Sequence, residues 1–194
     1  GIPMTPSLPT IYLVRHGETA WSVSGQHTGR TDIPLTPAGE AVAKLLPARL
    51  AGVTFSHVLS SPLLRARRTA ELAGFSPAVD PDLQEWDYGD FEGKTSAEIR
   101  KVHPGWLLFR DGPPGGESVA EMTARVDRVV GKLRGLSGNV LVFAHGHFLR
   151  TLACRWVRQP VGFAQHLLLG TAAICKLGFD HHNPDEPAIA AWNT

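Results

Sequence analysis

The sequence predicts a three-layer α/β/α sandwich built around a mostly parallel sheet. Ile11–Val14 and Val140–Ala144 are short, continuous apolar runs, as expected for parallel strands buried on both faces. Such runs alternate along the chain with amphipathic helical patterns and their cap signals. A chain of 194 residues with 43% hydrophobic content suits one well-buried domain, expected to span residues 1–194.

The first strand is followed by a polar loop, residues 22–33, and then by a helix. Thr36 supplies a capping side chain and Pro37 fits the first helical position. Gly52 is expected to end this helix. Its apolar face is predicted to comprise Val42, Leu45, Leu46 and Leu50.

A second strand is expected at Phe55–Leu59. Ser61 and Pro62 repeat the order of cap and proline, so we expect a second helix to start there, with Arg65 in its first turns. That start would place Arg65 near the carboxyl end of the strand.

Residues 75–117 are rich in proline and glycine, and we interpret them as an insertion that covers the site like a lid. A capping box at Thr95–Glu98 predicts a short helix within it. Ser118–Glu121 is a second capping box, followed by a helical apolar stripe that runs from Val119 to Leu133. The strand at Val140–Ala144 follows.

After that strand the pattern predicts a helix from about Phe148 to Val157 and a final strand around Ala172–Phe179. These two elements complete the alternation of strands and helices.

Composition excludes several classes of protein. Lysine and arginine number 19 against 18 acidic residues, so the net charge of +1 gives no general basic field for nucleic acid. Cys154 and Cys175 are too few for a disulfide framework; two buried thiols in a reducing cytosol are favoured, and a single bridge stays open.

The chain is expected to be a cytoplasmic protein that does not bind membranes, as a monomer or homodimer. No apolar run approaches the roughly 20 residues of a membrane span, and the first residues do not resemble a signal peptide. Gly1–Pro3 precede Met4 and are interpreted as a remnant of cloning.

Polar side chains stand where two apolar strands end. Arg15 and His16 follow the first strand, and His145 and His147 follow the strand at Val140–Ala144. Ligands of open α/β sheets bind at the carboxyl ends of strands. The histidines are therefore candidates for a reaction site.

Four segments, in this order, resemble the histidine phosphatase superfamily, also called phosphoglycerate-mutase-like. They are Arg15–Thr19, Ser60–Ala66, Glu85 with the Gly115–Ser118 turn, and Ala144–His147. The resemblance spans most of the chain. It implies the phosphoglycerate-mutase-like α/β/α fold and the hydrolysis of a small phosphate ester, without a metal or another cofactor.

The resemblance also implies a role for each residue. His16 matches the nucleophile that carries the phosphoryl group as phosphohistidine, which splits one difficult step into two. Arg15 and Arg65 match the planar forks that bind phosphate, and His145 matches a further donor. Glu85 matches the proton donor. Burial would raise the pKa of such an acid, whereas neighbouring arginines would lower it.

Each assignment has a simpler alternative. Arg15 and His16 would then be a surface arginine and a turn histidine. Arg65 would be a charge on a helix surface, as its neighbours at 67 and 68 are expected to be. Glu85 competes with Asp87 and Glu92. The ordered set of motifs favours the catalytic interpretation. The remaining histidines, His27 among them, are expected to be structural or solvated.

Other positions are expected to contact substrate. Ser22 stands where many members of the family carry a phosphate-binding asparagine, so either serine binds less strongly or another donor substitutes. Thr28 and Gly29 lie in a loop that often contacts phosphate or substrate. A wall that is partly aromatic and partly hydrogen-bonding is expected from Trp21, Trp86, Tyr88, His147 and Phe148. Such a wall suits a polyol phosphate.

The motifs around Glu85 and His145 resemble a subgroup that contains sedoheptulose-bisphosphatases and broad acid phosphatases, which points to sugar phosphates or bisphosphates. Cofactor-dependent phosphoglycerate mutases share the core motifs but carry a longer basic insertion after the acidic residue. Residues 85–118 are short here, so hydrolysis is favoured over mutase transfer.

Two further classes remain as alternatives. A non-catalytic module could hold a phosphorylated ligand in the basic pocket. His145 and His147 also have a metal-ligand spacing, but no partner motif accompanies them and the chain is shorter than a metal-binding barrel of roughly 250 residues.

Overall fold

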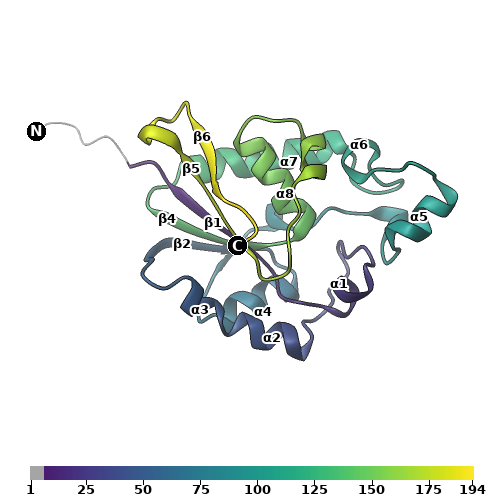
Figure 1. Cartoon of the computed structure of the whole chain (residues 1–194), viewed down its shortest axis with the longest axis horizontal. Helices are drawn as coiled ribbons and strands as arrows, with labels where there is room; N and C mark the ends of the chain where they lie inside the picture. The colour runs from purple at the N-terminus through teal and green to yellow at the C-terminus, as the bar shows by residue number, and fades with distance from the viewer. Residues whose placement is uncertain (1–6) are drawn as a thin grey trace, which may run out of the picture.

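The computed structural model describes residues 7–194 and contains a sheet of six strands with helices on both faces (Figure 1). The strand order is β3-β2-β4-β1-β5-β6. The predicted α/β/α architecture is thereby confirmed. The proposed cloning remnant, residues 1–3, lies outside the described part of the chain.

Four neighbouring strands run parallel, and the last two strands are antiparallel to their neighbours. In chain order they are β1 (Thr10–Arg15), β2 (Phe55–Ser60), β3 (Ala78–Val79), β4 (Asn139–Ala144), β5 (Ile174–Phe179) and β6 (Pro187–Ala191). The prediction missed β3 and β6. Both are edge strands, and β3 has only two residues, too few to show a periodicity.

The helices cover both faces of this sheet. They are α1 (Ala20–Ser24), α2 (Pro37–Ala43), α3 (Leu46–Arg49), α4 (Leu64–Leu72), α5 (Ser96–Val102), α6 (Leu108–Asp111), α7 (Val119–Arg134) and α8 (Gly146–Trp156). Short 3₁₀ turns occur at η1 (Pro81–Leu83), η2 (Gly89–Phe91), η3 (Val161–His166) and η4 (Asp180–His182). Among residues 7–194, no helix combines the length and the apolar character that a membrane crossing needs.

Strand β4 shows why the central strands are apolar throughout. Val140 and Val142 pack into the core on the side of α7 and α8, whereas Leu141 and Phe143 pack into the core on the side of α2, α3 and α4. Figure 1 shows the two groups of helices on opposite sides of the sheet. Successive side chains of a strand point to opposite faces, so a strand covered on both sides must be apolar at every position.

Both predicted capping boxes are present. Thr95 accepts a hydrogen bond from the backbone N–H of Glu98, whose carboxylate accepts in return, and Ser118 and Glu121 make the same pair of bonds. They begin α5 and α7 at the expected residues. The segment that contains α5 and α6 contributes Ile99, Trp106 and Phe109 to the main core, so it is closely packed against the rest of the molecule.

The helix predicted to run from Thr36 to Gly52 is instead divided into α2 and α3. Pro47 cannot donate to the carbonyl four residues earlier, and its ring would clash with that carbonyl in a continuous helix. The division changes which residues are buried: Leu46 and Leu50 enter the core, whereas Val42 and Leu45 are exposed.

Two local starts also differ from expectation. Ser22 lies in the short helix α1 and not in a loop. Helix α4 begins at Leu64 with Leu63 as its cap residue, because the Ser61 hydroxyl accepts the backbone N–H of Leu63 in a turn that precedes the helix. Arg65 is nevertheless in the first turn of α4, as predicted.

The buried thiols of Cys154 and Cys175 are free, as the sequence analysis favoured, and burial raises the pKa of each to about 11.

The register of the parallel strands brings three polar ends together. Arg15 of β1 pairs with Ala144 of β4, and the backbone N–H of His16 donates to the Ala144 carbonyl at 3.0 Å. On the other side of β4, the N–H of Ser61 donates to Phe143 at 3.0 Å. His16, His145 and Ser61 therefore directly follow three adjacent strands, β1, β4 and β2. The carboxyl ends of these strands form one edge of the sheet.

Candidate active site

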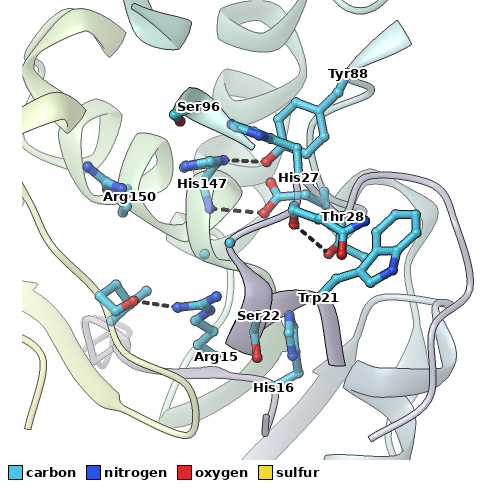
Figure 2. Close-up of a pocket in the computed structure, with 15 residues that line it drawn as sticks. Arg15, His16, Trp21, Ser22, His27, Thr28, Tyr88, Ser96, His147 and Arg150 are labelled. Carbon is cyan, nitrogen blue, oxygen red and sulfur yellow. Dashed lines mark hydrogen bonds between the residues drawn. The ribbon is translucent and has the colours of Figure 1, made fainter. Parts of the chain in front are cut away.

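A cavity of about 220 Å³ opens at this edge of the sheet. Figure 2 shows Arg15, His16 and Ser22 at its lower end and Tyr88, His27, Ser96 and His147 at its upper end. The predicted site residues that line it are Arg15, His16, Trp21, Ser22, Thr28, Glu85, Tyr88 and His147. Residues that sequence reasoning did not assign to the site also line it: Gly25, Gln26, His27, Ser96, Gly146, Arg150 and Leu169.

His16 is held in one tautomer. Its Nδ1 atom lies 2.7 Å from the carbonyl oxygen of Gly17, which can only accept, so Nδ1 carries the ring hydrogen and Nε2 keeps its lone pair. Burial, followed by the charges of Arg15 and Arg65, lowers the pKa of His16 well below its ordinary value. The ring is therefore neutral at neutral pH, as a nucleophile must be.

The backbone beside His16 is also fixed. The N–H of Gly17 donates to the Thr69 hydroxyl at 3.0 Å, and that hydroxyl donates to the Arg65 carbonyl at 2.7 Å. A Cβ on Gly17 would lie 2.9 Å from the carbonyl oxygen of Gly39, so the helix α2 can approach this turn only because residue 17 is glycine.

His145 lies beside His16, with 5.3 Å between the ring centroids. Its Nε2 is 2.7 Å from the Ser61 hydroxyl, and its buried Nδ1 has no hydrogen-bond partner among residues 7–194. Burial and the charge of Arg65 lower the pKa of His145 well below its ordinary value. His145 does not line the cavity itself; it lies fully buried behind it.

Of the two predicted phosphate-binding arginines, Arg15 is partly buried and lines the cavity, whereas Arg65 is fully buried and does not line it. Arg15 donates from Nη1 to the Leu169 carbonyl at 2.6 Å. Arg65 donates to the carbonyls of Thr28, Gly29 and Thr31 at 2.7 to 3.0 Å. In both guanidinium groups Nε is buried and lacks a partner within the described chain.

Three buried nitrogen atoms of the predicted site residues thus have no hydrogen-bond partner within residues 7–194: Nε of Arg15, Nε of Arg65 and Nδ1 of His145. Buried polar groups are nearly always hydrogen-bonded in proteins, and an unpaired one costs about 1–3 kcal/mol. The three atoms lie on the last residue of β1, in the first turn of α4 and on the residue that follows β4.

Glu85 bridges its own segment to the start of α8. Its Oε1 accepts the backbone N–H groups of Trp86 and Phe148, each at 2.8 Å, and its Oε2 accepts that of His147 at 3.0 Å. Burial raises the pKa of Glu85, and the hydrogen bonds and Arg65 oppose that rise without cancelling it. Of the carboxylates predicted as competitors, neither Asp87 nor Glu92 lines the cavity.

Arg125 holds the backbone of Glu85 in place, and sequence reasoning missed it. The buried guanidinium donates to the carbonyls of Asp82, Gln84 and Glu85 and forms an ion pair with Glu117 at 2.8 Å. Its position in the sequence could have identified it. Arg125 stands on α7 three residues after the buried Met122, where an apolar side chain would be expected.

The loop expected to contact substrate is clamped from two sides. Arg65 binds the carbonyls of Thr28 and Gly29, while Glu92 accepts the backbone N–H groups of Gly29 and Arg30 at 2.6 and 2.9 Å. Thr28 lines the cavity; Gly29 does not. A Cβ on Gly29 would lie 2.6 Å from the Trp86 carbonyl, so glycine permits this close approach.

The Ser22 hydroxyl lines the cavity but already has partners. It accepts the backbone N–H of Thr19 and donates its only hydrogen to the Thr19 carbonyl, both at 2.9 Å. It therefore has no hydrogen left for phosphate while this capping arrangement persists.

Two members of the predicted aromatic wall lie elsewhere. Trp86 and Phe148 are fully buried in the main core and do not line the cavity. Phe148 is the third residue of α8, and its side chain points into the layer between α8 and α7, where it stacks beneath the guanidinium of Arg125. Trp21, Tyr88 and His147 do line the cavity.

The upper end of the cavity is a cluster of neutral rings. The Tyr88 hydroxyl is hydrogen-bonded to Nδ1 of His147, and the ring of His27 stacks on that of His147 with centroids 5.8 Å apart. Burial raises the pKa of Tyr88 and lowers that of His147 far from their ordinary values. Both groups are therefore neutral at neutral pH, and one hydrogen joins the Tyr88 oxygen to Nδ1 of His147.

Within residues 7–194, the cluster able to hold a metal ion is Asp180, His181 and Glu186, which is exposed and lines no part of this cavity. His145 and His147 do not belong to a metal-binding cluster in that range.

Comparisons with known proteins place the chain in a family. Residues 11–194 match the model of the histidine phosphatase superfamily, branch 1. The chain is 42% identical over 176 residues to an acid phosphatase of Mycobacterium tuberculosis. The alignment covers 88% of this chain and 87% of the relative. It is 32% identical to the sedoheptulose 1,7-bisphosphatase of Saccharomyces cerevisiae, in an alignment that covers 95% of this chain and 93% of the relative.

A solved structure from Mycobacterium tuberculosis superimposes with a TM-score of 0.88 at 39% identity, over 95% of this chain and 96% of that one. Fold and sequence agree. The chain belongs to branch 1 of the histidine phosphatase superfamily and is an enzyme of the phosphatase type found there.

Proposed function

We propose that this enzyme hydrolyses small phosphate monoesters through a phosphohistidine on Nε2 of His16. The observation that carries the proposal is the tautomer of His16. Its Nδ1–H is given to the Gly17 carbonyl, which leaves a neutral Nε2 beside the unpaired donors of Arg15 and Arg65. A ready nucleophile and unpaired cationic donors are the parts that phosphoryl transfer requires.

The phosphoryl oxygens are held by Arg15, Arg65 and His145. Catalysis of phosphoryl transfer depends mainly on positioning and on donors aimed at the charged oxygens. Arg15 and Arg65 are fixed through their outer nitrogens to backbone carbonyls, which orients each fork before substrate arrives.

Ser61 sets the tautomer of His145 in this proposal. The Ser61 oxygen accepts the N–H of Leu63, and its hydroxyl hydrogen is donated to Nε2 of His145. The ring hydrogen then resides on the buried Nδ1, which becomes a third donor to phosphate.

Glu85 supplies and recovers the proton. Both lone-pair positions of Oε1 are taken by backbone N–H groups and Oε2 accepts only one, so the acidic hydrogen resides on Oε2. The raised pKa of Glu85 favours the protonated acid in mildly acidic solution.

The reaction balances in two steps. Nε2 of His16 forms a bond to phosphorus while the ester P–O bond breaks, and Glu85 protonates the departing alkoxide. Water then attacks phosphorus, Glu85 takes its proton, and the N–P bond returns its electron pair to Nε2. Inorganic phosphate leaves and Glu85 is again an acid.

Sugar phosphates or bisphosphates are the substrate class we favour. The cavity is small and its upper end presents hydroxyl and imidazole groups, namely Tyr88, Ser96, His27 and His147, which suit a polyol. The similarity to an acid phosphatase and to a sedoheptulose bisphosphatase supports the same class.

A phosphoglycerate mutase reaction would use the same nucleophile and remains the alternative. Hydrolysis is favoured because residues 85–118 are short, and the lysines and arginines in that range do not line the cavity. A mutase assay with phosphoglycerates distinguishes the two reactions.

The test is phosphate release from a panel of sugar mono- and bisphosphates, phosphoglycerates, nucleotides and phosphopeptides. His16→Ala is expected to abolish release, and the native protein is expected to form a phosphoenzyme that is labile in acid. His182→Ala, at an exposed histidine remote from the cavity lining, is the matched control. Appreciable turnover by His16→Ala would remove His16 as the nucleophile, and binding without any hydrolysis would favour a non-catalytic module.

A further inference from the structure

Arg150 is a second guanidinium at the cavity, separate from the predicted phosphate-binding residues. It lies on α8 three residues after His147, on the same face of the helix, and both side chains line the cavity. Of the lysines and arginines in the described chain, only Arg15 and Arg150 line this space.

Contacts within the protein fix the Arg150 guanidinium through two of its three nitrogen atoms. Nε and Nη2 donate to the Ala164 carbonyl at 3.2 and 3.0 Å, and the guanidinium stacks over the Phe109 ring at 4.9 Å. These contacts join α8 to η3 and orient the fork. Nη1 has no hydrogen-bond partner within residues 7–194, and solvent reaches it.

Within residues 7–194, no carboxylate forms an ion pair with the Arg150 guanidinium. The ion pairs of the described residues do not include Arg150, although its side chain is half-buried. Burial lowers the pKa of Arg150, whereas the negative charge of Glu85, the charged group with the largest effect on that pKa, raises it. The proposed mechanism, however, keeps Glu85 protonated when substrate binds. A partly desolvated positive charge without a negatively charged partner is energetically unfavourable, and a bound anion would reduce that cost.

The donors around Arg150 suit an oxyanion. The Tyr88 hydroxyl is hydrogen-bonded to Nδ1 of His147, and Figure 2 shows Ser96 and Arg150 near that ring. A second hollow of about 160 Å³ shares His27, Ser96, His147 and Arg150 with the main cavity, so there is space beyond the reacting end.

Figure 2 shows Arg150 beside His147 and above Arg15, with His16 at the lower end of the cavity. We infer that Arg150 binds a second oxyanion of the substrate, carboxylate or phosphate, at the end of the cavity opposite His16. The inference rests on the proposed function: one phosphoryl group reacts at His16 while the other anionic group is held by Arg150. Substrates would then be phosphate esters with two anionic groups.

The test measures binding of phosphonates, which need no turnover. Alkylphosphonates with propyl to hexyl chains are compared by calorimetry with analogues that end in a carboxylate or a second phosphonate. The readout is the ratio of the two Kd values at each chain length. We expect a gain of about tenfold at the length that spans the two ends, the usual size for a hydrogen-bonded charge. The two series distinguish carboxylate from phosphate.

Arg150→Gln is expected to remove that gain. Arg155→Gln is the matched control, because Arg155 is on the same helix, pairs with Asp127 at 2.7 Å and does not line the cavity. Arg150→Lys, which keeps the charge without the fork, is expected to retain part of the gain.

The inference is overturned if no chain length shows a gain in the native protein, or if the gain survives in Arg150→Gln. It is also overturned if Arg150→Gln weakens both kinds of phosphonate equally, which would assign Arg150 to the reacting phosphate. Failure to hydrolyse any ester would defeat the proposed function and leave this binding measurement valid.

Discussion

Glu85→Gln tests the proton donor most directly. The amide keeps the size of the side chain, and its oxygen can still accept the two N–H groups that now bind Oε1. Its NH₂ would face the backbone N–H of His147, where Oε2 now accepts at 3.0 Å. Two opposed donors cost about 1–3 kcal/mol in a buried site, so a lower melting temperature is expected with an intact fold.

The catalytic effect should depend on the leaving group. A sugar alkoxide needs a proton as it departs, so kcat for a sugar phosphate is expected to fall by about 10²–10⁴, the usual range for a positioned general acid. p-Nitrophenolate leaves without a proton, so formation of the phosphoenzyme from its ester is expected to be much less affected. Rapid-quench measurement of that first step provides the comparison.

The pH profile gives a second readout. Activity requires neutral His16, whose pKa is lowered, and protonated Glu85, whose pKa is raised. Activity therefore rises with pH as His16 loses its proton and falls with pH as Glu85 loses its own, with a maximum between the two pKa values. Glu85→Gln is expected to lose the descending limb. Equal losses for both esters, with that limb retained, would refute the assignment of Glu85.

Two other substitutions test how the phosphate donors are held. Ser61→Ala removes the hydrogen-bond partner of Nε2 in His145 and is expected to lower kcat/KM by about tenfold. Ser60→Ala serves as the neighbouring control, and equal activity of the two variants would show that Ser61 has no role in the site. Gly146→Ala would place a Cβ 3.0 Å from Nε of Arg15 and displace the Arg15 guanidinium. We expect kcat to fall by about tenfold or more, with little change in melting temperature. An unchanged kcat would show that the position of this guanidinium is not critical.

The polar strand ends were predictable because the strands themselves are easily recognised. Continuous apolar runs identify β1 and β4, and in a parallel sheet the residues just beyond their carboxyl ends lie at one edge. The capping boxes at Thr95 and Ser118 were equally clear, since each is a local pattern that satisfies backbone donors whatever the rest of the chain does.

Positions governed by helix phase were harder to predict. Phe148 and Arg150 are two residues apart on α8, yet one enters the core and the other reaches the cavity. The predicted helix began near Phe148, whereas α8 begins at Gly146, and the location of its partners α7 and η3 is not encoded in the local pattern. Arg150 was therefore missed and Phe148 was assigned to the wall.

The sequence by itself determined the central strands β1 and β4, the polar turn at Arg15 and His16, and the second histidine, because these depend on strand pattern and on residues adjacent in the chain. Only the tertiary structure decided the tautomer of His16, the unpaired donors and the anion-binding role inferred for Arg150. These properties depend on which segments remote in sequence come within hydrogen-bond distance and which are kept from water. Packing decides both.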